Sequence, residues 1–288
     1  MTQHTLELPD VDLVYDVHGP LPTKDGRPPL MMIGQPMDAS GFQAQVKLLG
    51  DRTVVTYDPR GLGRSVRKDG GVTNEPDVQA EDVHAIIEAL GAGPVDMFAS
   101  SGGAVSALAL VTAHPQDVVT LVAHEPPIDS VLPDAEAVHR VRIAYTRAYQ
   151  ERGWGAGMAA FVAMTSWEGE VTEEFLAQPA PDPAAFGMPT EDDGSRDDPL
   201  LSELSWAVPL YEPDLEALKA SPTRIVVAVG EESLKGYTGR TALALAEKLG
   251  QQATVFPSHH GGFMGGEFGY AGQPEAFAAT LREVLDRS

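Results

Sequence analysis

A serine pair followed by two glycines is the place in this chain where the residue types point most directly to chemistry. An apolar run through Ala99 is typical of a buried strand and ends at Ser100 and Ser101, after which Gly102 and Gly103 lead into a helical pattern. A serine at the vertex of such a strand–turn–helix is held in a strained backbone conformation with its hydroxyl exposed, ready to attack a carbonyl carbon. The pattern predicts a nucleophile, although a turn of this composition is about as often purely structural.

Ser101 fits the vertex better than Ser100, because the residues two before and two after a nucleophile in this turn must be small. Centring the motif on Ser101 places Ala99 and Gly103 at those positions. Centring it on Ser100 places Phe98 at the first of them, where its ring would clash. We therefore expect Ser101 to be the reactive serine, provided that the rest of the chain supplies its partners.

A histidine late in the chain is the natural base for Ser101. A serine nucleophile needs a base, and the base needs an acid that orients it. His259 and His260 lie in a turn directly after the last expected strand, 253–256. The carboxyl ends of parallel strands meet at one edge of a sheet, so this turn and Ser101 should share that edge. His260 is favoured because two glycines and Phe263 follow it.

The elements that must position these residues alternate along the chain between short β-branched runs and amphipathic helical patterns. The expected strands are 12–17, 30–33, 53–57, 94–99, 118–123, 224–229 and 253–256. The expected helices of the same part of the chain are 78–90, 104–114, 241–249 and 274–285. This alternation predicts an α/β fold in which helices cover both faces of a mostly parallel sheet.

One region breaks the alternation, between Pro126 and Ser221. It begins with two prolines, contains helical patterns over 135–151 and 157–164, and has a middle rich in proline and aspartate. A block of this kind between two core strands is typical of a helical lid over one sheet edge. We expect residues 126–221 to form the lid, and residues 1–125 and 222–288 to form the core.

Composition limits the classes of partner. The 288-residue chain is 43% hydrophobic, as expected for a globular enzyme, and its net charge of -22 disfavours nucleic acid and anionic membranes. It contains no cysteine, which excludes disulfides, thiolate catalysis and cysteine-ligated metals. The first residues lack a signal-peptide pattern, and no apolar run is long enough to span a membrane. We therefore expect a soluble cytoplasmic protein.

Metal and cofactor motifs are not recognisable. The segment 60–65 has neither a phosphate-binding loop pattern nor the third glycine of a dinucleotide motif. The acidic segment 191–198 lacks calcium-loop spacing, and the His259–His260 pair has no companions at zinc spacing. We expect neither a metal nor a cofactor.

Taken together, these motifs resemble those of the α/β-hydrolases over essentially the whole chain. The matching features are the turn 34–36, the segment 57–65, the serine turn at 101, the lid, and the run His260-Gly-Gly-Phe. Segments 34–38, 99–103 and 124–127 further resemble bacterial EstX-type hydrolases, a group of esterase-like enzymes associated with macrolide ester cleavage and antibiotic resistance. The resemblance implies an α/β-hydrolase fold, with an eight-stranded, mostly parallel sheet and a lid inserted after the sixth strand.

The resemblance also implies an oxyanion hole, the pair of N–H donors that stabilises the negative oxygen of the tetrahedral intermediate. One donor is the backbone N–H of Gly102, directly after the nucleophile. The other is the backbone N–H of Gln35, which follows Gly34 at the end of an early strand.

The acid departs from the usual pattern of the family, which places an aspartate three residues beyond the glycine that ends the penultimate strand. Here Gly230 is followed by Glu231 and Glu232, and a serine stands at the expected position. One possibility is that Glu232, or after it Glu231, reaches the histidine from this turn. The other is that the acid has moved to Glu125 at the end of the preceding strand, as in haloalkane dehalogenases. We favour Glu125 because the two prolines after it aim it rigidly.

These assignments imply a serine hydrolase that cleaves a carboxylic ester or lactone, a small-molecule substrate, through an acyl-enzyme, with macrolide-type lactones among the candidates. A serine nucleophile argues against epoxide hydrolases and dehalogenases of this fold, which use aspartate. Carbon–carbon bond hydrolases and cofactor-free haloperoxidases remain alternatives. A non-catalytic ligand-binding member of the family is the alternative from a different class. The sequence predicts no oligomeric state.

Overall fold

A single twisted sheet forms the centre of the molecule. The computed structural model describes residues 1–287. The strands within that range are β1 Thr2–Glu7, β2 Val11–His18, β3 Leu30–Gln35, β4 Val54–Tyr57, β5 Val66–Arg67, β6 Val95–Ser101, β7 Val118–His124, β8 Arg224–Gly230 and β9 Thr254–Phe256. Their order across the sheet is β1-β2-β4-β3-β6-β7-β8-β9, with β5 paired to β2.

The predicted mostly parallel sheet is confirmed. Pairing from β4 through β3, β6, β7 and β8 to β9 is parallel, whereas β2 runs antiparallel to its three neighbours, β1, β4 and β5. The path contains the eight strands expected, and β5 adds a two-residue ninth. β1 was missed by the sequence analysis. It is an edge strand whose side chains are almost all exposed, so it lacks the apolar alternation that identifies a strand.

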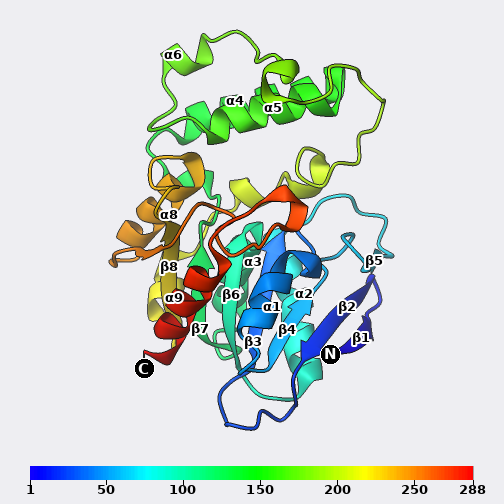
Figure 1. Ribbon diagram of the computed structural model, residues 1–288, viewed down its shortest axis with the longest axis vertical. Coiled ribbons are helices and arrows are strands. Elements are labelled where there is room, and N and C mark those ends of the chain that lie inside the picture. Colours follow the sequence, from blue (N-terminus) through cyan, green and yellow to red (C-terminus); the bar gives the residue numbers. More distant parts are fainter. Residues whose placement is uncertain (288) are drawn as a thin grey trace.

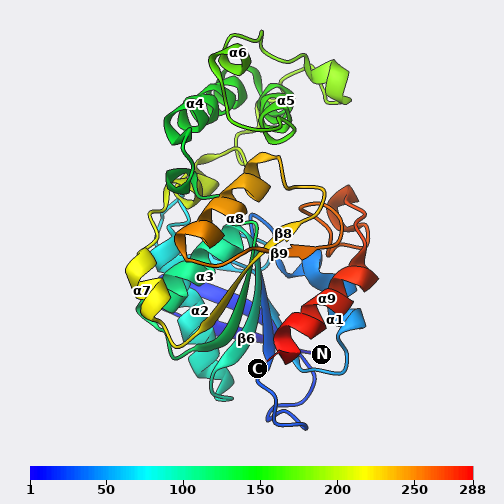
Figure 2. The ribbon, with the colours of Figure 1, turned by 90° about the vertical axis from the view of Figure 1, so that its left-hand side faces the viewer.

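Helices cover both faces of the sheet, as Figure 2 shows with the sheet seen nearly edge-on. The core helices are α1 Gln43–Leu48, α2 Pro76–Leu90, α3 Gly102–Ala113, α8 Tyr237–Lys248 and α9 Pro274–Asp286. α1 and α9 pack on one face, and α2, α3 and α8 pack on the other. Side chains of β3 alternate between these layers, with Met31 and Ile33 on the α3 side and Leu30 and Met32 on the α9 side.

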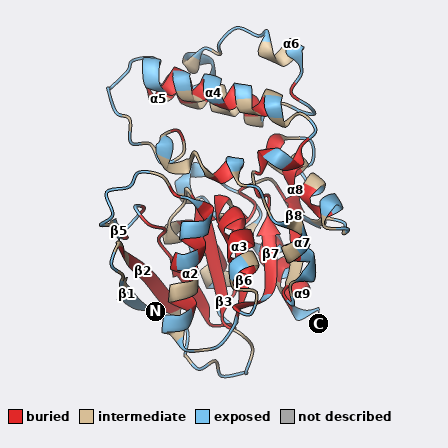
Figure 3. Ribbon diagram, turned by 180° about the vertical axis from the view of Figure 1, so that it is seen from behind, coloured by how far each residue is buried: buried red, intermediate tan, exposed pale blue. Residues whose placement is uncertain are grey.

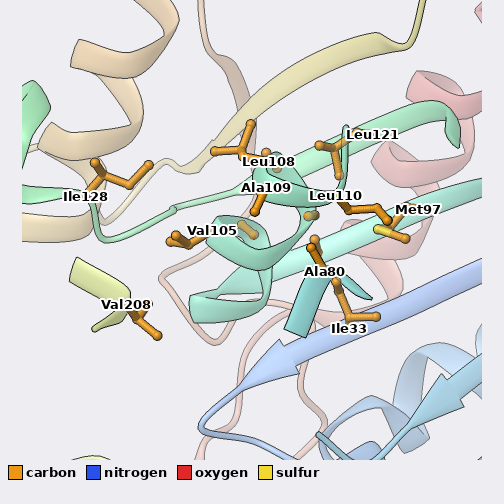
Figure 4. Close-up of a cluster of buried hydrophobic side chains, with 14 of the residues drawn as sticks. Ile33, Ala80, Met97, Val105, Leu108, Ala109, Leu110, Leu121, Ile128 and Val208 are labelled. Carbon is orange, nitrogen blue, oxygen red and sulfur yellow. The ribbon is translucent and has the colours of Figure 1, made fainter. Parts of the chain in front are cut away.

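α3, the helix that follows the serine turn, is buried along nearly its whole length. Figure 3 shows it, with the central strands, almost entirely in the colour of buried residues. Leu108 and Leu110 lie beside Leu121 of β7 and Met97 of β6 in Figure 4, within one apolar cluster. Val105 of the same helix lies near Val208. Burial on all sides fixes the helix, and with it the turn at its start.

Residues 126–221 leave the sheet after β7, the sixth strand along the eight-strand path. They contain α4 Ala135–Arg152, α5 Trp154–Thr165, α6 Glu173–Leu176 and α7 Leu215–Ala220. α4, α5 and α6 stand apart from the sheet at the end of the molecule to which β7 leads (Figure 1). α7 instead packs beside α3. Residues 126–221 are the segment predicted to form the lid, and the name is kept for them below.

Helix boundaries differ most from expectation at α8. The apolar pattern predicts a helix from 241, but α8 begins at Tyr237, one turn earlier, after Gly236 in an extended conformation. α2 ends as expected at Leu90 and is followed by Gly91, whose left-handed conformation, with φ 60°, is typical of a glycine that ends a helix. No helix within residues 1–287 combines the length and apolarity needed to cross a membrane.

Candidate active site

Ser101 is the last residue of β6, and its backbone is strained. Its φ of 56° and ψ of -129° lie outside the regions that non-glycine residues favour. Ser101 is partly exposed, whereas Ser100 is buried and its hydroxyl lies 3.2 Å from Nδ1 of His124. Of the two serines, Ser101 is therefore the more exposed, and this is the serine that the motif singled out.

Small residues around Ser101 let α3 start directly against β3. A Cβ on Gly103 would lie 2.7 Å from Cα of Gly34, so no side chain fits there. A Cβ on Gly102 would lie 3.0 Å from the backbone oxygen of Gln35. Gln35 also pairs with Ser101 in the register of β3 and β6. The two expected oxyanion donors therefore come from adjoining strand ends, the placement that a shared oxyanion hole requires.

Glu125 lies directly against His260. Its Oε2 is 2.5 Å from Nδ1 of His260, although the two residues are 135 positions apart in the chain. Glu125 follows β7, is fully buried and has a positive φ of 48°. The side chain of His260, in the turn after β9, is 41% exposed. A buried carboxylate on Nδ1 leaves Nε2 of the ring to accept a proton on the accessible side.

Two further donors hold the Glu125 carboxylate. The backbone N–H of Gly230 donates to Oε1 at 2.8 Å, and the hydroxyl of Thr238 donates to Oε2 at 2.5 Å. Burial by itself raises the pKa of Glu125, but attraction to His260 and the hydrogen bonds from His260 and Thr238 outweigh it and hold that pKa below its ordinary value. Glu125 is therefore an ionised acceptor at neutral pH.

The other candidate acids do not reach the imidazole. Oε1 of Glu231 accepts the backbone N–H of Ser258 at 3.3 Å. The backbone N–H of Glu232 donates to the oxygen of Ser258 at 3.1 Å. Within residues 1–287, neither carboxylate has a hydrogen bond to His260. Their turn supports the loop that carries the histidine, and only Glu125 is placed to orient the ring.

Within the same described range, no hydrogen bond joins the hydroxyl of Ser101 to His260. The segments that carry them are nevertheless linked through one residue of β7, His124. Ser100 pairs with His124 across β6 and β7, and the rings of His124 and His260 stack with centroids 6.0 Å apart. Catalytic hydrogen bonds of this type often tighten only when substrate binds.

His124 is a buried neighbour of the site that the sequence analysis did not single out. Its Nε2 lies 3.9 Å from Oε1 of Glu125. Burial lowers the pKa of His124 to about 4 and the charge of His260 adds to this effect, although Glu125 opposes it. Its ring packs among four aromatic side chains, Phe98, Phe256, Phe263 and Phe277. His124 is therefore neutral at pH 7.

A second histidine cluster lies at the opposite edge of the sheet. His84, His114 and Asp117 could approach a metal ion. Nδ1 of His84 is 2.6 Å from Asp117, and the rings of His84 and His114 stack 3.7 Å apart at an angle of 4°. In-plane nitrogen lone pairs of parallel rings do not converge on one ion, so this geometry suits hydrogen bonding to carboxylates better than metal ligation.

Comparison with known proteins finds relatives over nearly the whole chain. A model described as "Alpha/beta hydrolase family" matches residues 17–280. YraK of Bacillus subtilis, described as an uncharacterized hydrolase, is 28% identical over 289 residues, covering 98% of this chain and 96% of that protein.

Two solved structures show the same fold. A thermophilic esterase from Thermogutta terrifontis superposes with a TM-score of 0.64 at 21% identity, covering 99% of this chain and 98% of the esterase. An enol-lactonase from Burkholderia xenovorans LB400 superposes with a TM-score of 0.66 at 16% identity, covering 98% of this chain and 99% of the lactonase. At such identities the likeness establishes the architecture.

Proposed function

Because this chain belongs to the alpha/beta hydrolase family, we propose that it is a serine hydrolase acting on carboxylic esters or lactones. The observation that carries the proposal is the hydrogen bond between buried Glu125 and Nδ1 of His260, at the sheet edge where strained Ser101 ends β6. The order serine, acid, histidine along the chain is the order of triads in this fold.

The mechanism follows from these positions. Nε2 of His260 takes the hydroxyl proton of Ser101 as its oxygen bonds to the carbonyl carbon, and Glu125 stabilises the resulting imidazolium. The backbone N–H groups of Gly102 and Gln35 stabilise the tetrahedral oxyanion. His260 then gives the proton to the leaving alcohol, which leaves an acyl-enzyme. Water, deprotonated by His260, hydrolyses the acyl-enzyme and restores the hydroxyl. No step needs a metal or a cofactor.

The substrate class is the finer part of the proposal. Helices α4, α5 and α6 stand over the carboxyl end of the sheet, and a lid of this size suits a bulky and largely apolar small molecule. Resemblance to EstX-type enzymes makes macrocyclic lactones such as macrolides a specific candidate. The similar fold of an enol-lactonase makes smaller lactones a second group to test.

Labelling with a fluorophosphonate tests the serine chemistry. The wild-type protein should gain one adduct, located on Ser101 by peptide mass mapping, and Ser101→Ala should gain none. Ser100→Ala is the matched control and should still be labelled, because the Ser100 hydroxyl is buried against His124. An unlabelled wild-type protein would contradict the proposal and favour a binding function.

A substrate panel tests the bond that is cleaved. p-Nitrophenyl esters of increasing acyl length, simple lactones and macrocyclic lactones should include substrates whose hydrolysis Ser101→Ala abolishes. Labelling of Ser101 without turnover of any ester or lactone would point instead to the carbon–carbon hydrolase or haloperoxidase chemistry of this fold.

A further inference from the structure

Glu125 has a hydrogen-bond partner that the proposed mechanism does not use. Oε2 of Glu125 accepts both Nδ1–H of His260 and the hydroxyl of Thr238, each at 2.5 Å. Oε1 accepts the backbone N–H of Gly230. Of these three donors, Thr238 is the one side chain that the proposed mechanism does not use.

The orientation of the carboxylate depends on such contacts. The terminal torsion of a glutamate is broad, so its plane is set by its hydrogen bonds. Without the Thr238 hydroxyl, Oε2 would be held by His260 alone, and the carboxylate could pivot about Oε1, which Gly230 holds, and follow the imidazole. With the hydroxyl in place, the position of Oε2 is fixed independently of the imidazole. A fixed acceptor determines where Nε2 of His260 points.

Thr238 stands in the first turn of α8, beside a residue of a buried ionic cluster. The hydroxyl of Tyr237 donates to Oδ1 of Asp129 at 2.5 Å. Arg142 donates hydrogen bonds to the same carboxylate from Nε at 3.2 Å and from Nη2 at 3.0 and 3.1 Å. It also donates to the hydroxyls of Tyr237 at 3.0 Å and Tyr145 at 2.6 Å. All four side chains are buried.

This cluster joins three elements. Arg142 and Tyr145 belong to lid helix α4, Asp129 belongs to the turn just after Glu125, and Tyr237 belongs to α8. Removing one partner from a buried, hydrogen-bonded ion pair leaves an uncompensated charge, so the cluster resists separation. α4 and the first turn of α8 are therefore fastened together, and Thr238 moves with that turn.

We propose that Thr238 is a positioning residue for the Glu125–His260 pair, and that the Arg142–Asp129–Tyr237 cluster couples it to lid helix α4. This inference rests on the proposed serine hydrolase function. Its consequence is that the placement of α4 sets the geometry of the catalytic acid. Loss of the Thr238 hydroxyl lowers turnover of bound substrate and leaves substrate binding largely intact.

Paired variants at Thr238 test the positioning role. Thr238→Val keeps the shape and removes the hydroxyl, and it should lower kcat about tenfold with KM within about twofold. Thr238→Ser keeps the hydroxyl and should restore kcat to within about twofold of the wild type. A valine variant with wild-type kcat, or a serine variant as slow as the valine one, would contradict the proposal.

A spectroscopic measurement separates this inference from the proposed function. The proton on Nδ1 of His260, hydrogen-bonded to a carboxylate, should give a downfield NMR resonance. Thr238→Val should shift or broaden it and Thr238→Ser should not. If these changes occur but no ester or lactone is hydrolysed, the proposed function fails and the positioning stands. If hydrolysis occurs and the resonance is unaffected by valine, the positioning fails alone.

A double-mutant cycle tests the coupling to the lid. Tyr237→Phe removes the hydroxyl from Asp129 and should lower kcat several-fold, whereas Tyr145→Phe, which leaves the bond between Tyr237 and Asp129 in place, should have a smaller effect. In the Thr238→Val background, Tyr237→Phe should have little further effect, because the contact through which it acts is gone. Equal effects of Tyr237→Phe in both backgrounds would overturn the coupling.

Arg142→Lys is the substitute if Tyr237→Phe fails to fold. It keeps the positive charge and loses the bidentate hydrogen bonding of Arg142 to Asp129.

Discussion

Two histidine–carboxylate pairs occupy opposite edges of one sheet. At the carboxyl edge Nδ1 of His260 lies 2.5 Å from Glu125, and at the amino edge Nδ1 of His84 lies 2.6 Å from Asp117. The pairs have nearly the same length. At the carboxyl edge the acid is fully buried and Ser101 stands nearby, whereas at the amino edge Asp117 is also buried and the ring of His84 stacks on that of His114. A paired histidine becomes a candidate catalyst only through these surroundings.

The two edges also differ in which residues have a positive backbone φ angle. Non-glycine residues with positive φ in the described chain are Ser101, Glu125, Ser258 and Phe268, and the first three stand at or beside the site. At the amino edge, the turn before β6 has positive φ at Gly91 and Gly93, where no Cβ is strained. Strain is thus kept where a side chain must be aimed, and glycine is used where the chain only has to turn.

The largest expected contrast between the edges is in turnover. Glu125→Gln should lower kcat about 10³–10⁴-fold, because the imidazole loses the carboxylate that orients it and stabilises its charge. Asp117→Asn is the matched change at the amino edge and should leave kcat within about twofold. Steady-state kinetics on one ester substrate measures both. Near-normal activity of Glu125→Gln, together with loss of activity in Glu232→Gln, would identify Glu232 as the acid instead.

The next largest effect belongs to the carboxyl edge and concerns the pH dependence of the free energy of unfolding. The pKa of His124 is lowered to about 4 by burial, so between about 4 and its ordinary 6.5 the unfolded chain holds this proton and the folded chain does not. Stability therefore rises with pH across that window, and His124 contributes about 3 kcal/mol to the rise.

His124→Gln removes the titrating ring and keeps hydrogen-bonding capacity. The variant should show a rise smaller by about 3 kcal/mol when urea unfolding is compared between pH 4 and 7.5. An unchanged pH dependence would mean that His124 is protonated as readily in the folded chain as in the unfolded one.

Packing of glycine should also differ between the edges. Gly103→Ala should lower the free energy of unfolding by about 1–3 kcal/mol, because the added Cβ meets the backbone of Gly34, which cannot move aside. Gly50 lies before β4 at the amino edge, where a Cβ would make an ordinary contact 3.5 Å from the oxygen of Lys47. Gly50→Ala should leave stability unchanged or raise it slightly. Equal losses in thermal unfolding would show that Gly103 is not tightly packed.

The smallest effect belongs to the amino-edge pair itself. Asp117→Asn should lower the free energy of unfolding by about 1 kcal/mol or less, because the amide oxygen of asparagine can still accept the hydrogen bond from Nδ1 of His84. Denaturant titration measures the loss. A loss as large as that of Gly103→Ala would mean that the amino-edge pair is a major structural contact.

The sequence predicts the two ends of the site better than its middle. Ser101 and His260 stand out because local patterns mark them, a strand ending at small residues and a strand ending at a histidine turn. Glu125 could be ranked above Glu231 and Glu232 but not separated from them, because the choice depends on the tertiary arrangement of β7 and β8. In the structure, the N–H of Glu125 bonds to the oxygen of Ala228 and fixes that arrangement.

Thr238 and His124 carry no local signal of this kind. Thr238 contacts Glu125 across 113 residues, and the apolar pattern of α8 begins only after it. His124 belongs to an apolar strand in which a histidine gives no sign that it is buried and neutral. Periodicity identifies which face of an element is apolar, but it does not say which distant residue lies opposite.

β9 has a consequence for how activity is lost. It is three residues long, lies at the edge of the sheet and pairs only with β8, yet the loop that carries His260 follows it directly. Short edge strands open locally at a lower free energy than the core, so the loop can detach while β6 and α3 remain folded. In mild denaturant the protein should therefore lose its catalytic activity before it unfolds globally. Dilution of the denaturant should restore that activity faster than a globally unfolded chain refolds.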